Sequence, residues 1–308
     1  MTRKNFLEKY GQIMIPVVTP FDDKEEVNYS VYEELIEYLI KNDLCDSLIS
    51  TGTTGEASLL TFDERVKLYK TAVKAANGRK PIIAGTGCAS TKETIALTKE
   101  AEACGIDLCM VVAPFYNKPI QRGIIDHYKA VAAATEANIL LYNIPIFVGV
   151  NMEPPCVTEL AKVKNIIGIK DEAGINPTQI TDYLLATEKI NPEFIVINGD
   201  DIMLTPTIIQ GAIGIISGGA HIFGHEIREI FQAFASCDME KLKANFSKLY
   251  RFCQIYGLGG RILPNPILRP AIELVTGIKV GPARRPLSPI TDEEYQIMKD
   301  TLKALGKI

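Results

Sequence analysis

A lysine closes a run of apolar residues near the middle of this chain. The run Asn165–Lys170 reads NIIGIK, and Asp171 and Glu172 follow it directly. Because apolar, β-branched runs are typical of buried strands, we expect Lys170 at the mouth of a core, where desolvation lowers the pKa of its ammonium group. A partly neutral lysine can attack a ketone and form a Schiff base. A lysine that only caps a strand and points into water is the simpler alternative.

Threonine and tyrosine hydroxyls follow other apolar runs of the chain. Residues 51–56 read TGTTGE, so Thr53 and Thr54 stand between glycines that let the backbone approach an anion. Tyr116 follows one apolar run, and Tyr142 lies at the end of another. Formation and dehydration of a carbinolamine require a proton donor and acceptor beside the amine, and a phenol relayed through a hydroxyl supplies them. Each of these residues alone fits a turn or a packed side chain, whereas all of them together favour a catalytic role.

Eight apolar runs are expected to form the strands that position these residues. They are rich in isoleucine, valine and leucine with little alternation, as in strands covered on both faces, and most are separated by one amphipathic helical segment. Eight such units predict an α/β fold, the parallel (β/α)8 or TIM barrel. An open dinucleotide-binding sheet is less favoured, because no Gly-x-Gly-x-x-Gly opens a helix. The runs span residues 12–18, 44–50, 80–86, 106–113, 138–143, 165–170, 193–198 and 212–217.

Hydroxyl and carboxylate pairs mark three helix starts. Thr61–Glu64, Ser90–Glu93 and Thr291–Glu294 fit the capping box, in which two side chains satisfy orphan backbone amides reciprocally. Apolar residues recur at helical spacing after Thr61. We therefore expect a helix to begin at each of the three pairs.

The last part of the chain, from about residue 224, carries helical patterns only. Pro264, Pro266 and Pro270 are expected to break these helices around Asn265. We therefore expect a catalytic barrel over residues 1–223 and a C-terminal helical extension over residues 224–308, without a flexible linker between them.

The composition argues against several classes of protein. Of 308 residues, 47% are hydrophobic, and 33 Lys and Arg against 37 Asp and Glu give a net charge of −4, so no nucleic-acid surface is expected. No apolar stretch approaches the roughly 18 residues of a membrane span. The charged N-terminus lacks the apolar core of a signal peptide. Seven scattered cysteines without a Cys-x-x-Cys pair fit reduced thiols in a cytoplasmic protein.

The barrel prediction brings the candidate residues to one place, because the C-terminal ends of barrel strands face a common site. The segments expected there are residues 51–56 after the second run, 113–119 after the fourth, 142–145 at the end of the fifth, Lys170 at the end of the sixth, 198–201 after the seventh and 217–219 after the eighth.

These segments, in this order, resemble those of the dihydrodipicolinate synthase and N-acetylneuraminate lyase family. The family comprises pyruvate-handling Schiff-base lyases and aldolases on a (β/α)8 barrel with a C-terminal helical extension. The resemblance covers nearly the whole chain, and the number of ordered matches makes it specific. The matching segments are GTTGE at 52–56, GTG at 85–87, PFYNKP at 114–119, YNIP at 142–145, GIK at 168–170, GDD at 199–201 and NP at 265–266.

The resemblance implies catalytic roles for four residues. Lys170 would be the Schiff-base nucleophile, and Tyr142 would be the proton shuttle beside the imine. Thr53 would relay protons between Tyr142 and Tyr116, which would reach in from a neighbouring subunit. The resemblance also implies a homotetramer built as a dimer of dimers.

It further implies how the substrate is bound. Thr53, Thr54 and Gly55 would hold the carboxylate of the 2-keto acid through hydroxyl and amide groups. Gly199 and Ile216 would frame the pocket through their backbone. No metal or dissociable cofactor is implied, because the reactive group is the covalent imine between Lys170 and pyruvate.

One residue departs from the pattern of the synthase. The segment after YNIP carries an arginine in the synthase that grips the carboxylate of L-aspartate semialdehyde, and Phe147 stands at this position here. A phenyl ring supplies neither the charge nor the forked donors of a guanidinium. Two aldehydes therefore stay open: the semialdehyde of the dihydrodipicolinate synthase reaction, and the partner aldehyde of a 2-keto-3-deoxy sugar acid or a related 2-keto acid aldolase.

Two further alternatives come from other classes of protein. His221 and His225 stand at i and i+4, so one helical face could present them to the zinc ion of a metal-dependent aldolase. Only His127 remains as a further histidine, and no cysteine or acidic residue has a confirming spacing. A barrel that binds a keto acid without turnover is the non-catalytic alternative, although binding alone requires no Schiff-base machinery.

Overall fold

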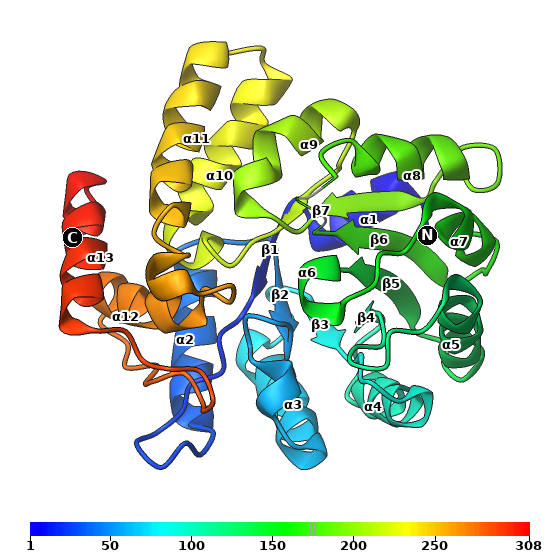
Figure 1. Ribbon diagram of the computed structural model, residues 1–308, viewed down its shortest axis with the longest axis horizontal. Helices are drawn as coiled ribbons and strands as arrows, with labels where there is room; N and C mark the ends of the chain where they lie inside the picture. The colour runs from blue at the N-terminus through cyan, green and yellow to red at the C-terminus, as the bar shows by residue number, and fades with distance from the viewer. Residues whose placement is uncertain (173, 175) are drawn as a thin grey trace.

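A closed barrel of eight parallel strands forms the centre of the molecule, which confirms the predicted (β/α)8 fold (Figure 1). The computed structural model describes residues 1–172, 174 and 176–308. Neighbouring strands pair in chain order, and β8 closes on β1. Each predicted run overlaps one strand. The strands are β1 (Ile13–Pro16), β2 (Ser47–Ser50), β3 (Ile82–Gly85), β4 (Leu108–Val112), β5 (Asn138–Asn143), β6 (Ile166–Asp171), β7 (Ile195–Asn198) and β8 (Ile215–Ile216).

Helices surround the barrel, and three more lie beyond it. In Figure 1 the strands occupy the centre, whereas α11 to α13 lie together at one side, in yellow to red. The α-helices are α1 (Arg3–Tyr10), α2 (Tyr29–Lys41), α3 (Phe62–Ala76), α4 (Thr91–Ala103), α5 (Gln121–Ala133), α6 (Pro145–Val148), α7 (Pro154–Leu160), α8 (Gln179–Thr187), α9 (Leu204–Gln210), α10 (Ala220–Ala235), α11 (Met239–Cys253), α12 (Asn265–Thr276) and α13 (Asp292–Ala304). Short 3₁₀ helices are η1 (Ala57–Leu59), η2 (Asp201–Met203) and η3 (Leu258–Gly260).

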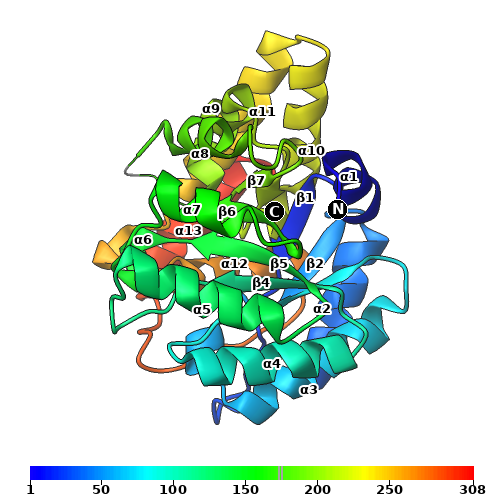
Figure 2. The ribbon, with the colours of Figure 1, turned by 90° about the vertical axis from the view of Figure 1, so that its right-hand side faces the viewer.

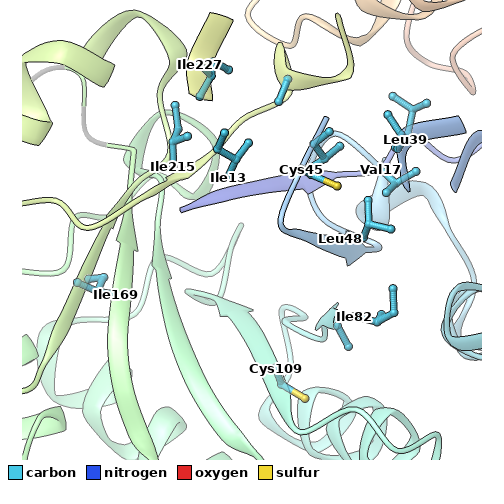
Figure 3. Close-up of a cluster of buried hydrophobic side chains, with 14 of the residues drawn as sticks. Ile13, Val17, Leu39, Cys45, Leu48, Ile82, Cys109, Ile169, Ile215 and Ile227 are labelled. Atoms are coloured by element: carbon cyan, nitrogen blue, oxygen red, sulfur yellow. The ribbon is translucent and has the colours of Figure 1, made fainter. Parts of the chain in front are cut away.

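The strands separate two apolar layers. Ile13 and Ile15 of β1 belong to the layer between strands and helices, whereas Met14 points into the barrel. Figure 3 shows part of the outer layer, in which Leu39 of α2 and Ile227 of α10 join strand residues. Because both faces of the sheet exclude water from apolar surface, the strands need no polar alternation, as the sequence indicates.

The predicted capping boxes are complete at two of three helix starts. Thr61 and Thr291 each accept a hydrogen bond from the amide of the glutamate three residues later, and that glutamate accepts one from the cap amide. At Ser90 only the serine half forms, with the Glu93 amide 3.5 Å from the hydroxyl oxygen. The helix begins there as predicted.

The helical pattern is interrupted before Asn265, as expected, because α11 ends at Cys253 and α12 begins at Asn265, whereas Pro270 does not break the helix that contains it. Pro264 is the N-cap of α12, and Pro266 lies in the first turn, where backbone amides have no partner within the helix. Pro270 lies inside α12, at the cost of one backbone hydrogen bond. The buried face of α12 compensates, because Ile267, Leu268 and other residues pack into the core.

The chain after β8 first completes the barrel and then leaves it. The helix α10 packs against β1 and α11, and α12 packs against α13 (Figure 2). The predicted boundary between residues 223 and 224 falls at a kink in α10, where Phe223 is non-helical, and the division into barrel and extension stays a prediction. Within the described residues, no helix combines the length and apolarity that crossing a membrane requires.

Candidate active site

Lys170 lies at the inner face of β6, near its C-terminal end. Ile169 belongs to the outer layer, so strand alternation turns Lys170 into the barrel. Its side chain is only 5% exposed, and burial lowers the pKa of its ammonium group, while Glu172 opposes this shift. Gly199 leaves room for it, because a Cβ at position 199 would lie 2.4 Å from the Lys170 Cε. The amine is therefore desolvated, as predicted from its place at the end of an apolar run.

Tyr142 of β5 stands beside this lysine. The two residues are paired in the strand register, and the Lys170 Nζ lies 3.9 Å from the centroid of the Tyr142 ring. The Tyr142 hydroxyl donates a hydrogen bond of 2.8 Å to Glu172 Oε2, and the same oxygen lies 3.3 Å from Lys170 Nζ. Burial raises the pKa of Tyr142 well above its usual value, and Glu172 raises it further. The phenol is therefore protonated at neutral pH.

The loop after β2 brings threonine hydroxyls to the same place. Thr53 Oγ1 lies 3.2 Å from the Tyr142 hydroxyl. The loop begins at Thr51, which has a φ of 57° although it is β-branched, a backbone conformation that costs energy. The Thr51 hydroxyl offsets this strain by donating to the Gly85 carbonyl at 2.7 Å, so the loop is held from β3.

Glu56 fixes the other end of this loop to the C-terminal helices. Its carboxylate is buried against Arg269, with 2.8 Å between Oε1 and the guanidinium, and it also accepts from the Asn265 side chain at 3.0 Å and the Arg284 amide at 2.9 Å. Asn265 donates in addition to the Thr54 carbonyl at 3.0 Å. The residues after Pro264 therefore support the site, although they follow the last strand of the barrel.

A cavity of about 620 Å³ opens in front of Lys170, which is a usual size for a small-molecule site. Two carboxylates, Asp200 and Asp201, also line it. Burial raises the pKa of Asp200 to about 7 and that of Asp201 to about 6. Phe147 of α6, which is 38% exposed, lines this cavity and an adjoining one of about 280 Å³. Among the described residues that line the larger cavity, Lys170 is the one with a cationic side chain.

The structure brings most of the predicted site residues together. Seven of them line the larger cavity, namely Thr53, Thr54, Tyr142, Phe147, Lys170, Gly199 and Ile216. Gly55 does not line it; its carbonyl accepts a hydrogen bond of 2.7 Å from the Thr19 hydroxyl. Tyr116 is 90% exposed, with a φ of 69°, and lies outside the described lining of both cavities.

Glu172 was missed as a site residue from the sequence, although the signal was present. Successive side chains of a strand point to opposite faces, so residues two apart share a face. The Glu172 amide continues the pairing of β6 with β5 by donating to the Asn143 carbonyl at 2.9 Å. Glu172 therefore points into the barrel with Lys170.

Two of the three histidines are hydrogen bonded within the fold. The His221 Nε2 accepts from the Val18 amide at 3.3 Å, and its Nδ1 donates to the Gly218 carbonyl at 2.8 Å, so both nitrogens are engaged within the fold. His127 hydrogen bonds to the Thr91 hydroxyl at 2.9 Å. Within residues 1–172, 174 and 176–308, no three potential metal ligands of the His, Cys, Asp and Glu types gather at one point.

Comparison with known proteins agrees with this geometry. Residues 9–305 match the profile of the dihydrodipicolinate synthetase family. A 4-hydroxy-tetrahydrodipicolinate synthase of Halalkalibacterium halodurans is 40% identical over 287 residues, covering 93% of this chain and 94% of that protein. The crystal structure of a dihydrodipicolinate synthase from Bacillus anthracis superimposes with a TM-score of 0.90 at 35% identity, covering 96% and 98% of the two chains. The synthase of Cyanidioschyzon merolae, solved with lysine bound, gives a TM-score of 0.90 at 33% identity, covering 97% and 99%. This chain therefore belongs to the dihydrodipicolinate synthetase family and is a Schiff-base lyase or synthase.

Proposed function

We propose that the protein joins pyruvate to an aldehyde, or cleaves the product of that reaction, through an imine on Lys170. The observation that carries this proposal is the buried amine itself. It lies at the wall of a cavity of about 620 Å³, 3.9 Å from the Tyr142 ring centroid and 3.3 Å from the Glu172 carboxylate. A desolvated lysine with proton-transfer groups around it suits the attack on a ketone.

The residues of the cavity suit successive steps of this reaction. Once neutral, the Lys170 amine attacks the pyruvate carbonyl carbon and forms a carbinolamine. Tyr142 and Thr53 move protons as water leaves, and the imine then loses a proton from its methyl carbon to give an enamine. The enamine carbon attacks the aldehyde, and hydrolysis of the new imine releases the product. Thr54 and neighbouring amides hold the pyruvate carboxylate, as the TGTTGE turn suggests.

The names of the relatives make L-aspartate semialdehyde the first aldehyde to test. Phe147 supports a second candidate, the partner aldehyde of a 2-keto-3-deoxy sugar acid. The phenyl ring provides no donor for a substrate carboxylate, and the two aspartates that line the same cavity add negative charge once the pH exceeds their raised pKa values. A polyhydroxylated aldehyde requires no cation at this position.

We also propose that the protein acts as a homotetramer, a dimer of dimers, in the cytoplasm. Tyr116 supports the assembly, because a tyrosine with a positive φ is held in a costly conformation although 90% of it is exposed to solvent in the single subunit. If it acts across an interface, mixing subunits of K170A and Y116F will restore activity that neither variant has alone. The seven free cysteines fit a reducing compartment.

The reaction is tested by steady-state assays with pyruvate and each aldehyde, using K170A as the control. We expect a kcat/KM of about 10⁴ M⁻¹s⁻¹ or more for the true aldehyde and no turnover by K170A. Equal activity of K170A would contradict the proposal. Pyruvate binding without turnover on any aldehyde would favour the non-catalytic keto-acid binder, and loss of activity with a chelator would favour the metal-dependent aldolase.

A further inference from the structure

The Glu172 carboxylate contacts two groups that the proposed reaction uses, the Tyr142 hydroxyl and the Lys170 amine. Its Oε2 accepts from the Tyr142 hydroxyl at 2.8 Å and lies 3.3 Å from the Lys170 Nζ. The backbone holds it there, because its amide donates to the Asn143 carbonyl at 2.9 Å. Its side chain is 27% exposed, so it contacts both the cavity and solvent.

The number of protons that each group can donate sets the direction of the hydrogen bonds that run from Thr53 through Tyr142 to Glu172. A tyrosine has one hydroxyl proton, and a carboxylate can only accept. Because Tyr142 donates its proton to Glu172, Thr53 must donate to the Tyr142 oxygen across the 3.2 Å contact. Protons along Thr53 and Tyr142 therefore point toward Glu172, and so does the ammonium group of Lys170.

We propose that Glu172 is the catalytic proton acceptor of the imine-forming step, an inference that rests on the proposed function of Lys170. Glu172 takes one proton from the Lys170 ammonium, which leaves a neutral amine and a carboxylic acid. The nitrogen lone pair forms the bond to the pyruvate carbonyl carbon as the C=O π bond breaks.

The proton that Glu172 has taken from Lys170 must then reach the former carbonyl oxygen of pyruvate. Conversion of an ammonium and a ketone into an iminium and water moves two protons from nitrogen to the former carbonyl oxygen, with none gained or lost overall. Glu172 carries them in turn through the Tyr142 hydroxyl: the first protonates the alkoxide left by the attack and gives the carbinolamine, and the second protonates the carbinolamine hydroxyl as the C–O bond breaks and water leaves. At the end Glu172 is ionised again and pairs with the positive iminium nitrogen.

The other carboxylates of the cavity are placed differently. Asp200 accepts from the Ile202 amide at 3.0 Å as the N-cap of η2, and Asp201 accepts from the Gly219 amide at 2.9 Å. Among the described residues of the cavity, Glu172 is the acid that forms an ion pair with Lys170. It is therefore the acid in direct reach of the nucleophile.

The test measures how fast borohydride-trappable imine forms at saturating pyruvate in a single turnover, at pH 8. In E172Q the amide keeps the size of the side chain and an oxygen that accepts from Tyr142, but it cannot take up a proton at this pH. We expect imine formation to slow by at least about 100-fold, with pyruvate affinity changed much less, because general base catalysis contributes about 10² to 10⁴. E172D keeps a carboxylate and should recover part of this loss.

The matched control is D200N, which removes a carboxylate from the same cavity without breaking a contact to Lys170 or Tyr142. We expect it to slow imine formation by less than about tenfold. An E172Q rate within tenfold of the wild type, or equal losses in E172Q and D200N, would overturn the inference, since the second result would mean that the net charge of the cavity is what matters. If the wild-type Lys170 traps no pyruvate at all, the proposed function fails instead. Circular dichroism establishes that each variant is folded.

Discussion

The buried ion pair of Glu56 and Arg269 gives the clearest prediction for a residue that takes no part in the proposed reaction. Replacing it with glutamine leaves the Arg269 guanidinium, whose side chain is 1% exposed, without its counter-ion. The Glu56 side chain is itself 0% exposed, so solvent does not screen this pair. Removing one partner of a buried ion pair costs about 3–5 kcal/mol, because the remaining charge stays buried.

The surroundings of Arg269 place the expected cost at the lower end of this range. The guanidinium also donates to the Thr19 carbonyl at 2.5 Å and to the Val280 carbonyl at 3.1 Å, so it is not left without acceptors. The glutamine oxygen can take the place of Oε1, which accepts from both Arg269 and Asn265, but the acceptor for the Arg284 amide is then lost. We therefore expect E56Q to lower the free energy of unfolding by about 3 kcal/mol, a large part of the 5–15 kcal/mol of a typical protein.

Urea unfolding at pH 8 measures this change, with E33Q as the matched control. Glu33 pairs with Lys74 at 2.9 Å, but on the surface, with side-chain exposures of 40% and 73%, and its loss should cost at most about 1 kcal/mol. The double variant E56Q/R269M should be more stable than E56Q, since it removes the uncompensated charge. A loss below 1 kcal/mol in E56Q would refute the view that this pair fixes the threonine loop to the C-terminal helices.

Three further predictions concern the cavity. G199A should slow trapping of pyruvate by at least about tenfold while the protein stays folded, because the added Cβ would lie 2.4 Å from the Lys170 Cε; an unchanged rate in single-turnover assays would contradict this packing. The carboxyl of Asp200 has its pKa raised from 3.8 to about 7, so the folded protein holds a proton that the unfolded chain releases, and stability falls as the pH rises through that window. D200N should therefore raise the melting temperature at pH 8 and leave it unchanged at pH 3, and calorimetry showing the reverse would refute the sign. F147R should raise kcat/KM for L-aspartate semialdehyde by about 10- to 100-fold relative to a neutral aldehyde, because this is the scale of one charged hydrogen bond. Equal changes for both aldehydes would show that position 147 does not contact the carboxylate of the semialdehyde.

The sequence predicts the barrel well because its signals are local and repeated. Each strand is a short apolar run covered on both faces, so composition alone marks β5 or β6. The rule that strand ends meet at one mouth then brings Lys170, Tyr142 and Thr53 together without knowledge of any contact.

What the sequence did not predict depends on orientation and on neighbours far along the chain. Glu172 could have been found from the alternation of a strand, but the strand was expected to end at Lys170. Pro270 was expected to end a helix, whereas the packing of α12 offsets the lost hydrogen bond. The burial of Glu56 against Arg269 joins residues 213 positions apart, which no local pattern indicates. Tyr116 is expected to act from a neighbouring subunit, and this role stays a prediction.

The most direct test of the central claim is mass spectrometry of peptides after borohydride treatment with pyruvate. We predict that the peptide containing Lys170 gains one reduced pyruvyl group, that the modification requires pyruvate, and that other lysine peptides of the same sample stay unmodified. An unmodified Lys170 at saturating pyruvate, or equal labelling of surface lysines, would contradict the account, since the buried amine between Tyr142 and Glu172 would then not be the nucleophile.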